Sequence, residues 1–198
     1  MITSRELDPK ANRSFTLISG PSCEPVSVDE LKIFARIDGD DEDSLLESFI
    51  TAVRISIEAY TWRAIIEQQW RMRLDWWPGD VVEIPRSPLI SIDSVKTVNE
   101  DSSETTYSSG NYFVITDAEP GKLVIKNGAE WPSNEDRYHG GFQIDFTCGY
   151  GSAASNVPEG LRTAIMQWAT AVYENRAMTG TPPPEVKTIL NPYRMIWY

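Results

Sequence analysis

The sequence predicts an α+β fold, a helical bundle with an inserted antiparallel β module. Apolar residues recur every three or four positions near both ends of the chain and every second position in its middle. Short connections join the strand-like segments, which favours antiparallel pairing. We expect five parts: an N-terminal arm over 1–24, two parts of the helical bundle over 25–64 and 148–180, the β module over 65–147, and a C-terminal tail over 181–198.

The composition is that of a folded, acidic chain. Its 198 residues suit one domain of ordinary size, and the 41% of hydrophobic residues can fill a core. Eighteen basic and 29 acidic side chains give a net charge of −11. This charge disfavours a protein that grips nucleic acid through its phosphates. It suits a surface that repels DNA or one that binds a basic protein patch.

Three features bear on the compartment. No run of about 18 apolar residues is present, so no transmembrane helix and no membrane partner are predicted. The segment Met1–Glu6 lacks the apolar core of a signal peptide, and we therefore expect a cytosolic product. Cys23 and Cys148 do not have the spacing of a disulfide or zinc framework, so neither framework is predicted.

A capping box marks the first helix. Ser27 can accept hydrogen bonds from free backbone N–H groups while Glu30 reaches back to the backbone of Ser27. We expect this helix to end near 36–39. The arm before it contains an apolar island at 15–18, interpreted as a strand or as a segment ordered by a partner. The apolar stripe of the first helix consists of Leu31, Phe34 and Ala35.

The second helix begins at an acidic cluster over 40–43, because carboxylates favour the positive end of a helix dipole. Apolar residues then recur at three- and four-residue spacing as far as about Thr61. This spacing is typical of an amphipathic helix that is buried along one side. Its apolar residues are Leu45, Leu46, Phe49, Ile50, Val53, Ile57 and Tyr60.

The period then changes to two, which indicates half-buried strands. In the first strand, four apolar residues alternate with polar ones, and they are Trp70, Met72, Leu74 and Trp76. Arg71 and Arg73 between them could suggest stacking on nucleic acid, but cross-strand pairing with acidic residues is the preferred interpretation. Further strands are expected over 81–85, 88–95, 112–115, 123–125 and 142–146.

A third helix follows the strands. Pro158 suits its first turn, where a missing N–H group costs nothing. Three prolines at 182–184 then form a stiff spacer, and a short helical turn is expected over 186–190. The apolar face of the third helix consists of Leu161, Ile165, Trp168, Val172 and Tyr173.

No motif in the chain indicates catalysis, so we predict no catalytic residue, no cofactor and no enzyme activity. The acidic run over 38–47 suggests calcium, but Gly39 stands second rather than sixth in the run, and helix capping explains the charges better. No metal site is therefore predicted. His139 is the only histidine and lies beside two glycines in an expected turn. Neither a nucleophile elbow nor a phosphate-binding loop is present.

Two alternative functions remain open at this point. Trp76 and Trp77 could form a sugar-stacking surface, which would make the chain a monomeric carbohydrate- or peptide-binding β module. A hydrolase that uses an unrecognised carboxylate pair is less favoured, because no spacing among the 29 acidic residues singles out a pair.

The C-terminal residues are unusually apolar, and five of the last six are Tyr193, Met195, Ile196, Trp197 and Tyr198. Burying such a side chain is worth roughly 1.5–3 kcal/mol. These residues therefore either fold back onto the chain's own core or enter a partner. We favour partner binding, because the three prolines push the segment outward.

Taken in order, several short segments are similar to the head–tail connector (adaptor) protein family of long-tailed phages and gene-transfer particles. The segments are Pro25-Val26-Ser27 with Glu30 and Lys32, Arg36-Ile37-Asp38, Ala59-Tyr60-Thr61, Ile84 to Leu89, Ser91 to Val95, Trp131-Pro132, Gly149-Tyr150-Gly151, Val157-Pro158, Ala164-Ile165, Tyr173 to Arg176, and Pro192-Tyr193-Arg194. The chain departs from the family pattern after the long helix. Trp62 stands where the family usually has a glycine that ends the helix in a left-handed conformation.

The resemblance implies a structural adaptor that forms a ring, of dodecameric size, below the portal of a capsid and joins it to the tail. Its partners would be the portal protein, a tail-side connector or stopper protein, and further copies of itself, while DNA passes through the channel as cargo. The protein would be assembled in the bacterial cytoplasm and would lie at the head–tail interface of a virion or phage-like particle. The C-terminal segment becomes a candidate docking tail.

Overall fold

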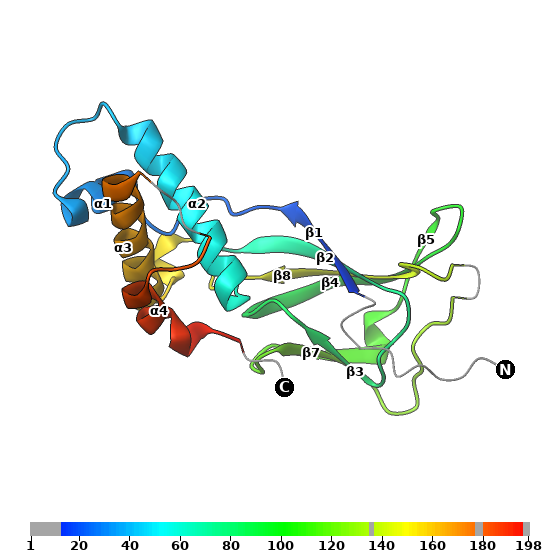
Figure 1. Ribbon diagram of the computed structural model, residues 1–198. Helices are drawn as coiled ribbons and strands as arrows, with labels where there is room; N and C mark the ends of the chain where they lie inside the picture. The colour runs from blue at the N-terminus through cyan, green and yellow to red at the C-terminus, as the bar shows by residue number, and fades with distance from the viewer. Residues whose placement is uncertain (1–12, 135–136, 177–179, 196–198) are drawn as a thin grey trace. The chain divides into compact units, whose positions relative to one another are not determined.

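The computed structural model describes residues 13–134, 137–176 and 180–195 (Figure 1). The α+β class is confirmed, with four helices and eight strands among these residues. They form two compact units, a β unit of residues 13–20 and 68–148 and a helical unit of 21–67 and the described residues from 149 onward. None of the described helices is long and apolar enough to cross a membrane.

The β unit contains two antiparallel sheets. One has five strands in the order β1-β2-β8-β4-β5, and the other has three in the order β3-β7-β6. The apolar island near the N-terminus lies in β1, which pairs with β2 from Arg13 to Ser19, so the strand interpretation is confirmed. The strand bounds are β1 Arg13–Ser19, β2 Gln68–Leu74, β3 Val81–Ile84, β4 Leu89–Val98, β5 Glu104–Thr106, β6 Tyr112–Ile115, β7 Gly121–Ile125 and β8 Phe142–Cys148.

The two faces of the five-stranded sheet differ in polarity. Met72 of β2 pairs with Ile144 of β8, and both are fully buried in the apolar core. On the opposite face, Arg71 donates two hydrogen bonds to Asp145, from Nε at 2.7 Å and from Nη2 at 3.0 Å. Burial alone would raise the pKa of Asp145, but the bonds from Arg71 outweigh it and hold this pKa below its ordinary value. The predicted cross-strand pairing of Arg71 is confirmed.

The helical unit contains α1, α2, α3 and α4, which share one core. The bounds are α1 Val28–Ala35, α2 Asp43–Thr61, α3 Glu159–Asn175 and α4 Pro184–Leu190. The predicted capping box of α1 is present, since the N–H of Glu30 donates to Ser27 Oγ and the N–H of Ser27 donates to the Glu30 carboxylate. Among the fully buried members of the core are Leu31, Leu46, Ile50, Leu161, Trp168 and Leu190.

A buried ion-pair network ties the N-terminal loop of the helical unit to α2. Arg54 donates to both oxygens of Glu24, at 2.7 and 3.1 Å, and to Glu58 at 3.1 Å. The other oxygen of Glu58 accepts the backbone N–H of Ile65 at 2.9 Å. Because the Arg54 and Glu58 side chains are only 7% and 8% exposed, these two charges of α2 are turned into the protein. This leaves the outward surface of α2 to uncharged residues over most of its length.

The end of α2 shows how the chain accommodates Trp62 where the family usually has a glycine. The helix ends at Thr61 as predicted, and Trp62 follows it with φ 60° and ψ 27°, which is the left-handed conformation. The N–H of Trp62 donates to the carbonyl of Glu58 at 2.9 Å, so the cap is complete. Trp62 therefore takes the conformation that a glycine adopts more easily.

Candidate interaction surfaces

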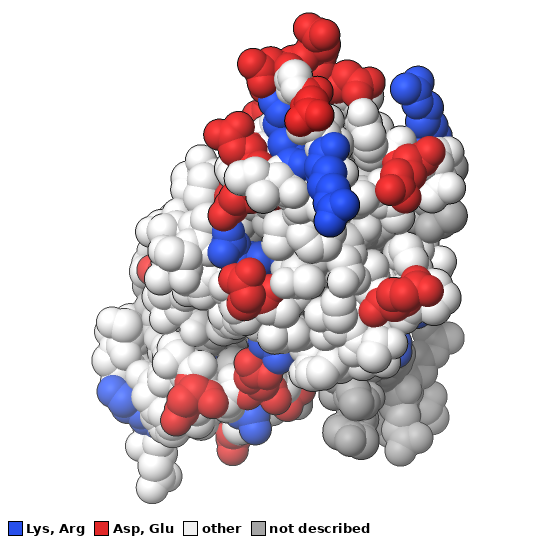
Figure 2. All heavy atoms as spheres, turned by 90° about the vertical axis from the view of Figure 1, so that its left-hand side faces the viewer, with Lys and Arg blue, Asp and Glu red and all other residues white. Residues whose placement is uncertain are grey.

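The acidic run between α1 and α2 is organised around a lysine. Lys32 Nζ lies 2.6 Å from Asp40 Oδ1 and 2.7 Å from Asp43 Oδ1, and these hydrogen bonds raise the pKa of Lys32 and lower that of Asp40. Figure 2 shows Asp and Glu gathered at the top of the view, where this connection lies. Within the described part of the chain, no group of three or more His, Cys, Asp or Glu residues is placed to hold a metal ion.

His139 lies in an exposed loop of the β unit. Its Nδ1 is 3.1 Å from Asp75 Oδ2, and the other oxygen of Asp75 accepts the N–H of Gly140 at 2.7 Å. The imidazole side chain is 91% exposed. These contacts fasten a turn to the end of β2, which is a structural role.

The two neighbouring tryptophans of the β unit, Trp76 and Trp77, have different environments. Trp77 stacks on Trp131 with ring centroids 4.4 Å apart, and its ring also contacts Phe142 at 4.9 Å. The indole Nε1 of Trp77 donates to the carbonyl of Pro132 at 3.0 Å. Trp77 therefore fastens the 131–132 segment to the sheet, while Trp76 is 36% exposed.

The C-terminal segment is attached to the helical unit as far as Met195. The carbonyl of Tyr193 accepts a hydrogen bond from Arg63 Nε at 2.5 Å, and the N–H of Met195 donates to the carbonyl of Thr61 at 3.1 Å. Met195 is only 8% exposed, and Tyr193 packs against the core. A Cβ on Gly160 would lie 2.6 Å from the Tyr193 hydroxyl, so a glycine leaves room for this ring.

Three of the five proposed partner-binding residues, Ile196, Trp197 and Tyr198, lie outside the described residues. Of the other two, Tyr193 is half-buried against the core of its own unit and Met195 is buried. Partner binding by the five residues stays a prediction.

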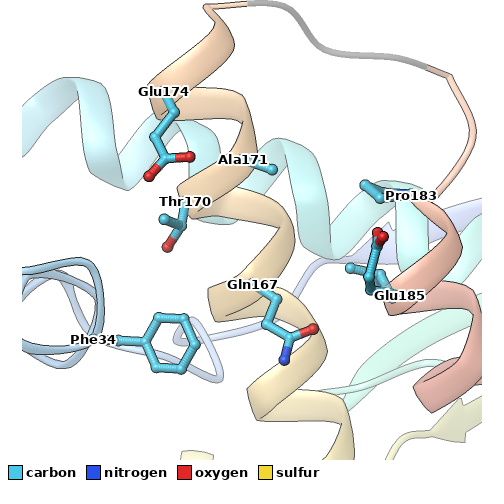
Figure 3. A pocket seen from close by; sticks show the side chains of 8 residues that line it. Phe34, Gln167, Thr170, Ala171, Glu174, Pro183 and Glu185 are labelled. Carbon is cyan, nitrogen blue, oxygen red and sulfur yellow. The ribbon is translucent and has the colours of Figure 1, made fainter.

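A groove lies on the helical unit beside α3 (Figure 3). It has a volume of about 270 Å³, and α1, α3 and the start of α4 supply its walls. Phe34 extends from α1 toward the side chains of α3, and these are faced by Glu185 of α4 and by Pro183, which precedes α4. The lining residues are Phe34, Gln167, Thr170, Ala171, Glu174, Pro183, Glu185 and Val186.

Two residues that the sequence placed on buried stripes are in fact at the surface. Phe34 of α1 is 43% exposed and Leu45 of α2 is 41% exposed. Each lies at the border of an apolar stripe, where periodicity alone cannot distinguish core from surface. The sequence did not predict the groove either, because the groove depends on how three helices pack together. The structure shows that Phe34 and its neighbour Ile33, which is 80% exposed, form an apolar surface that the sequence pattern did not indicate.

Comparisons with known proteins agree with the resemblance seen in the sequence. The model of a family described as phage gp6-like head-tail connector protein matches residues 25–119. The resemblance to head–tail connectors is thereby confirmed. A search of curated proteins found no match.

Solved structures show the same fold. A chain in the neck of an empty gene transfer agent particle, with C6 symmetry, is 23% identical with a TM-score of 0.80, and the match covers 93% of this chain and 97% of that one. A chain in the virion of a native gene transfer agent particle is 24% identical with a TM-score of 0.79, covering 93% and 96%. A chain in a native neck with C12 symmetry is 24% identical with a TM-score of 0.73, covering 92% and 97%.

Proposed function

We propose that this chain is a structural, non-enzymatic adaptor at the head–tail interface of a phage or phage-like particle. The match of residues 25–119 to the head-tail connector family carries the proposal. The shared fold with chains in the necks of gene transfer agent particles supports it over both units of the chain. Function belongs to sites rather than to folds, so the surfaces of the chain must also suit the role.

The charge of the chain suits a ring through which DNA passes. A net charge of −11 weakens binding to phosphates, and a conduit that attracted DNA would slow its passage. The necks that contain chains of this fold have C6 or C12 symmetry. We infer a cyclic ring, dodecameric in the simplest case, that lies below the portal protein and above a tail-side connector or stopper protein.

The C-terminal segment is the proposed contact with the portal or with a neighbouring subunit. The hydrogen bond from Met195 to Thr61 fixes the chain at one point on the helical unit. Ile196, Trp197 and Tyr198 follow in the sequence, and we propose that a partner buries these three large apolar side chains.

Removing the gene tests this function directly. The proposal expects that cells without the chain produce heads and tails that remain separate, and that supplying the chain restores joined particles. Electron microscopy of the particles and their protein composition provide the readout. Normal tailed particles in the absence of the chain would contradict the proposal.

A further inference from the structure

Helix α2 has a second apolar face that points away from the core. Its core face holds Leu46, Ile50, Val53 and Ile57, all at most 1% exposed. Residues spaced three or four apart share a face of a helix. On the opposite side this spacing selects six residues, here called the outer stripe: Leu45, Ser48, Ala52, Ile55, Ala59 and the capping Trp62.

The outer stripe is uncharged, and all of its residues except the half-buried Ala52 are exposed. Leu45, Ile55 and Trp62 are 41%, 54% and 44% exposed. Between Ser48 and Trp62 the only charged residues are Arg54 and Glu58, and both are buried. Charged residues make up 24% of the chain, and a solvent-facing helix surface normally carries many of them. Small residues between large apolar ones also allow a second surface to approach closely.

A second apolar surface lies on the other side of the same unit. Ile33 and Phe34 of α1 are 80% and 43% exposed, and Phe34 also lines the groove beside α3. Seen from the groove, α2 passes behind α3 (Figure 3). The groove and the outer stripe therefore lie on opposite flanks of the helical unit. We call Ile33, Phe34 and the groove the receiving flank.

We infer that the outer stripe of one copy docks against the receiving flank of a second copy of this chain. The inference rests on the proposed function and names the contact that would build the ring. A cyclic ring needs two different patches on each subunit. In a twelvefold ring, neighbouring subunits differ by a rotation of about 30°, so the two patches must lie on nearly opposite flanks. A chain of this fold lies in a neck with C12 symmetry, and this supports a second copy as the occupant.

Charge supports the same occupant. Two copies that each carry a net charge of −11 repel one another over most of their surfaces. Glu174 and Glu185, both exposed, border the groove and would repel an acidic surface. From Ser48 to Trp62 the outer stripe contains no carboxylate. It can therefore approach these two glutamates without the repulsion that an acidic surface of a second copy would meet.

The size of the contact indicates how tightly it holds. The outer stripe runs about 26 Å along the helix at 1.5 Å per residue, and with a width of about 10 Å it covers on the order of 250 Å². Stable interfaces bury about 800 Å² on each partner. The contact therefore holds free copies together only weakly. It gains strength in a closed ring, where neighbours are already held in place.

Site-directed crosslinking of the full-length protein tests the docking. Ala59→Cys in the outer stripe is combined with Thr170→Cys in the groove, in a Cys23→Ser background, and a short bismaleimide is added at high protein concentration. The two positions lie on opposite flanks of one copy, so a ladder of covalent oligomers requires contact between copies. Ile90→Cys with Thr170→Cys is the control pair, since Ile90 is 40% exposed but lies in β4.

A second substitution checks specificity. Adding Ile55→Glu should reduce the ladder about tenfold, whereas adding Ile90→Glu should leave it unchanged. Ile55→Ser serves in place of Ile55→Glu if the glutamate variant loses its helical circular dichroism. An absent ladder, a ladder of equal strength in the control pair, or one that Ile55→Glu leaves unchanged would overturn the inference.

Incorporation into particles separates this inference from the proposed function. If the wild-type chain is missing from purified particles, the proposed function fails. If the wild-type chain is present and the Ile55→Glu chain is incorporated equally well, the function stands and the docking surface is wrong. Reduced incorporation of Ile55→Glu, with normal incorporation of Ile90→Glu, supports both.

Discussion

Replacing Arg54 by methionine should destabilise the helical unit strongly. Arg54 is the shared partner of Glu24 and Glu58, and its removal takes the same cation away from both carboxylates. Removing one member of a buried ion pair costs about 3–5 kcal/mol. The low end applies, because the Glu24 side chain is 24% exposed to water and Glu58 keeps the N–H of Ile65. We expect a loss of about 3 kcal/mol in the free energy of unfolding.

Urea unfolding followed by circular dichroism measures this loss. If the whole chain unfolds cooperatively, the same loss of free energy lowers the midpoint temperature of thermal unfolding by about 6–12 °C. Arg176→Met is the matched control, because the Arg176 side chain is 82% exposed and lies 3.9 Å from Glu42. It should change stability by less than about 0.5 kcal/mol.

A double variant identifies the cause. Adding Glu58→Gln to Arg54→Met removes one of the two carboxylate charges that lost Arg54, while leaving an oxygen that can accept the N–H of Ile65. The double variant should therefore be more stable than Arg54→Met alone. A loss below about 1 kcal/mol for Arg54→Met, or a double variant less stable than the single one, would refute this reasoning.

Three further predictions concern the helix cap, the sheet and the C-terminus. Trp62→Gly should be more stable than Trp62→Ala by about 1 kcal/mol in urea unfolding, because only glycine is free of strain at φ 60°; the usual order with alanine ahead would contradict the left-handed cap. Asp145→Asn should destabilise the protein at pH 7 but scarcely at about pH 2, since a depressed carboxyl pKa contributes stability that is complete above about pH 3.9 and is lost as the pH falls through the folded-state pKa; an equal loss at both pH values would argue against the ion pair with Arg71. Deleting 196–198 should block attachment to heads without changing the unfolding temperature, whereas deleting 193–198 should also lower that temperature, because it removes the bonds to Arg63 and Thr61; a folding defect in the shorter deletion would assign those residues to the core.

Local chemistry made most helix and strand positions predictable. Ser27 and Glu30 form the capping box that their spacing indicates, and α2 ends at Thr61. The alternation around Met72 and Leu74 correctly predicted a half-buried strand, which spans Gln68–Leu74. β5 was not predicted, because Glu104–Thr106 is polar and exposed throughout and carries no periodic signal.

Surface features were harder to predict than elements. Phe34 and Leu45 continue apolar stripes in sequence, yet both are exposed, because neighbouring helices cover only part of each stripe. The conformation of Trp62 could not be read from its residue type, since a left-handed tryptophan is uncommon. Whether a residue at the border of an apolar stripe is buried depends on tertiary contacts, which the sequence pattern does not give.

The most direct test of the adaptor role is the position of this chain in an assembled particle. Cryo-electron microscopy of particles that carry the chain should show its two-unit fold as a ring at the neck, between the portal and the tail, with a channel along the axis. Density for the chain elsewhere in the particle, or its absence from the neck, would contradict the role proposed for it.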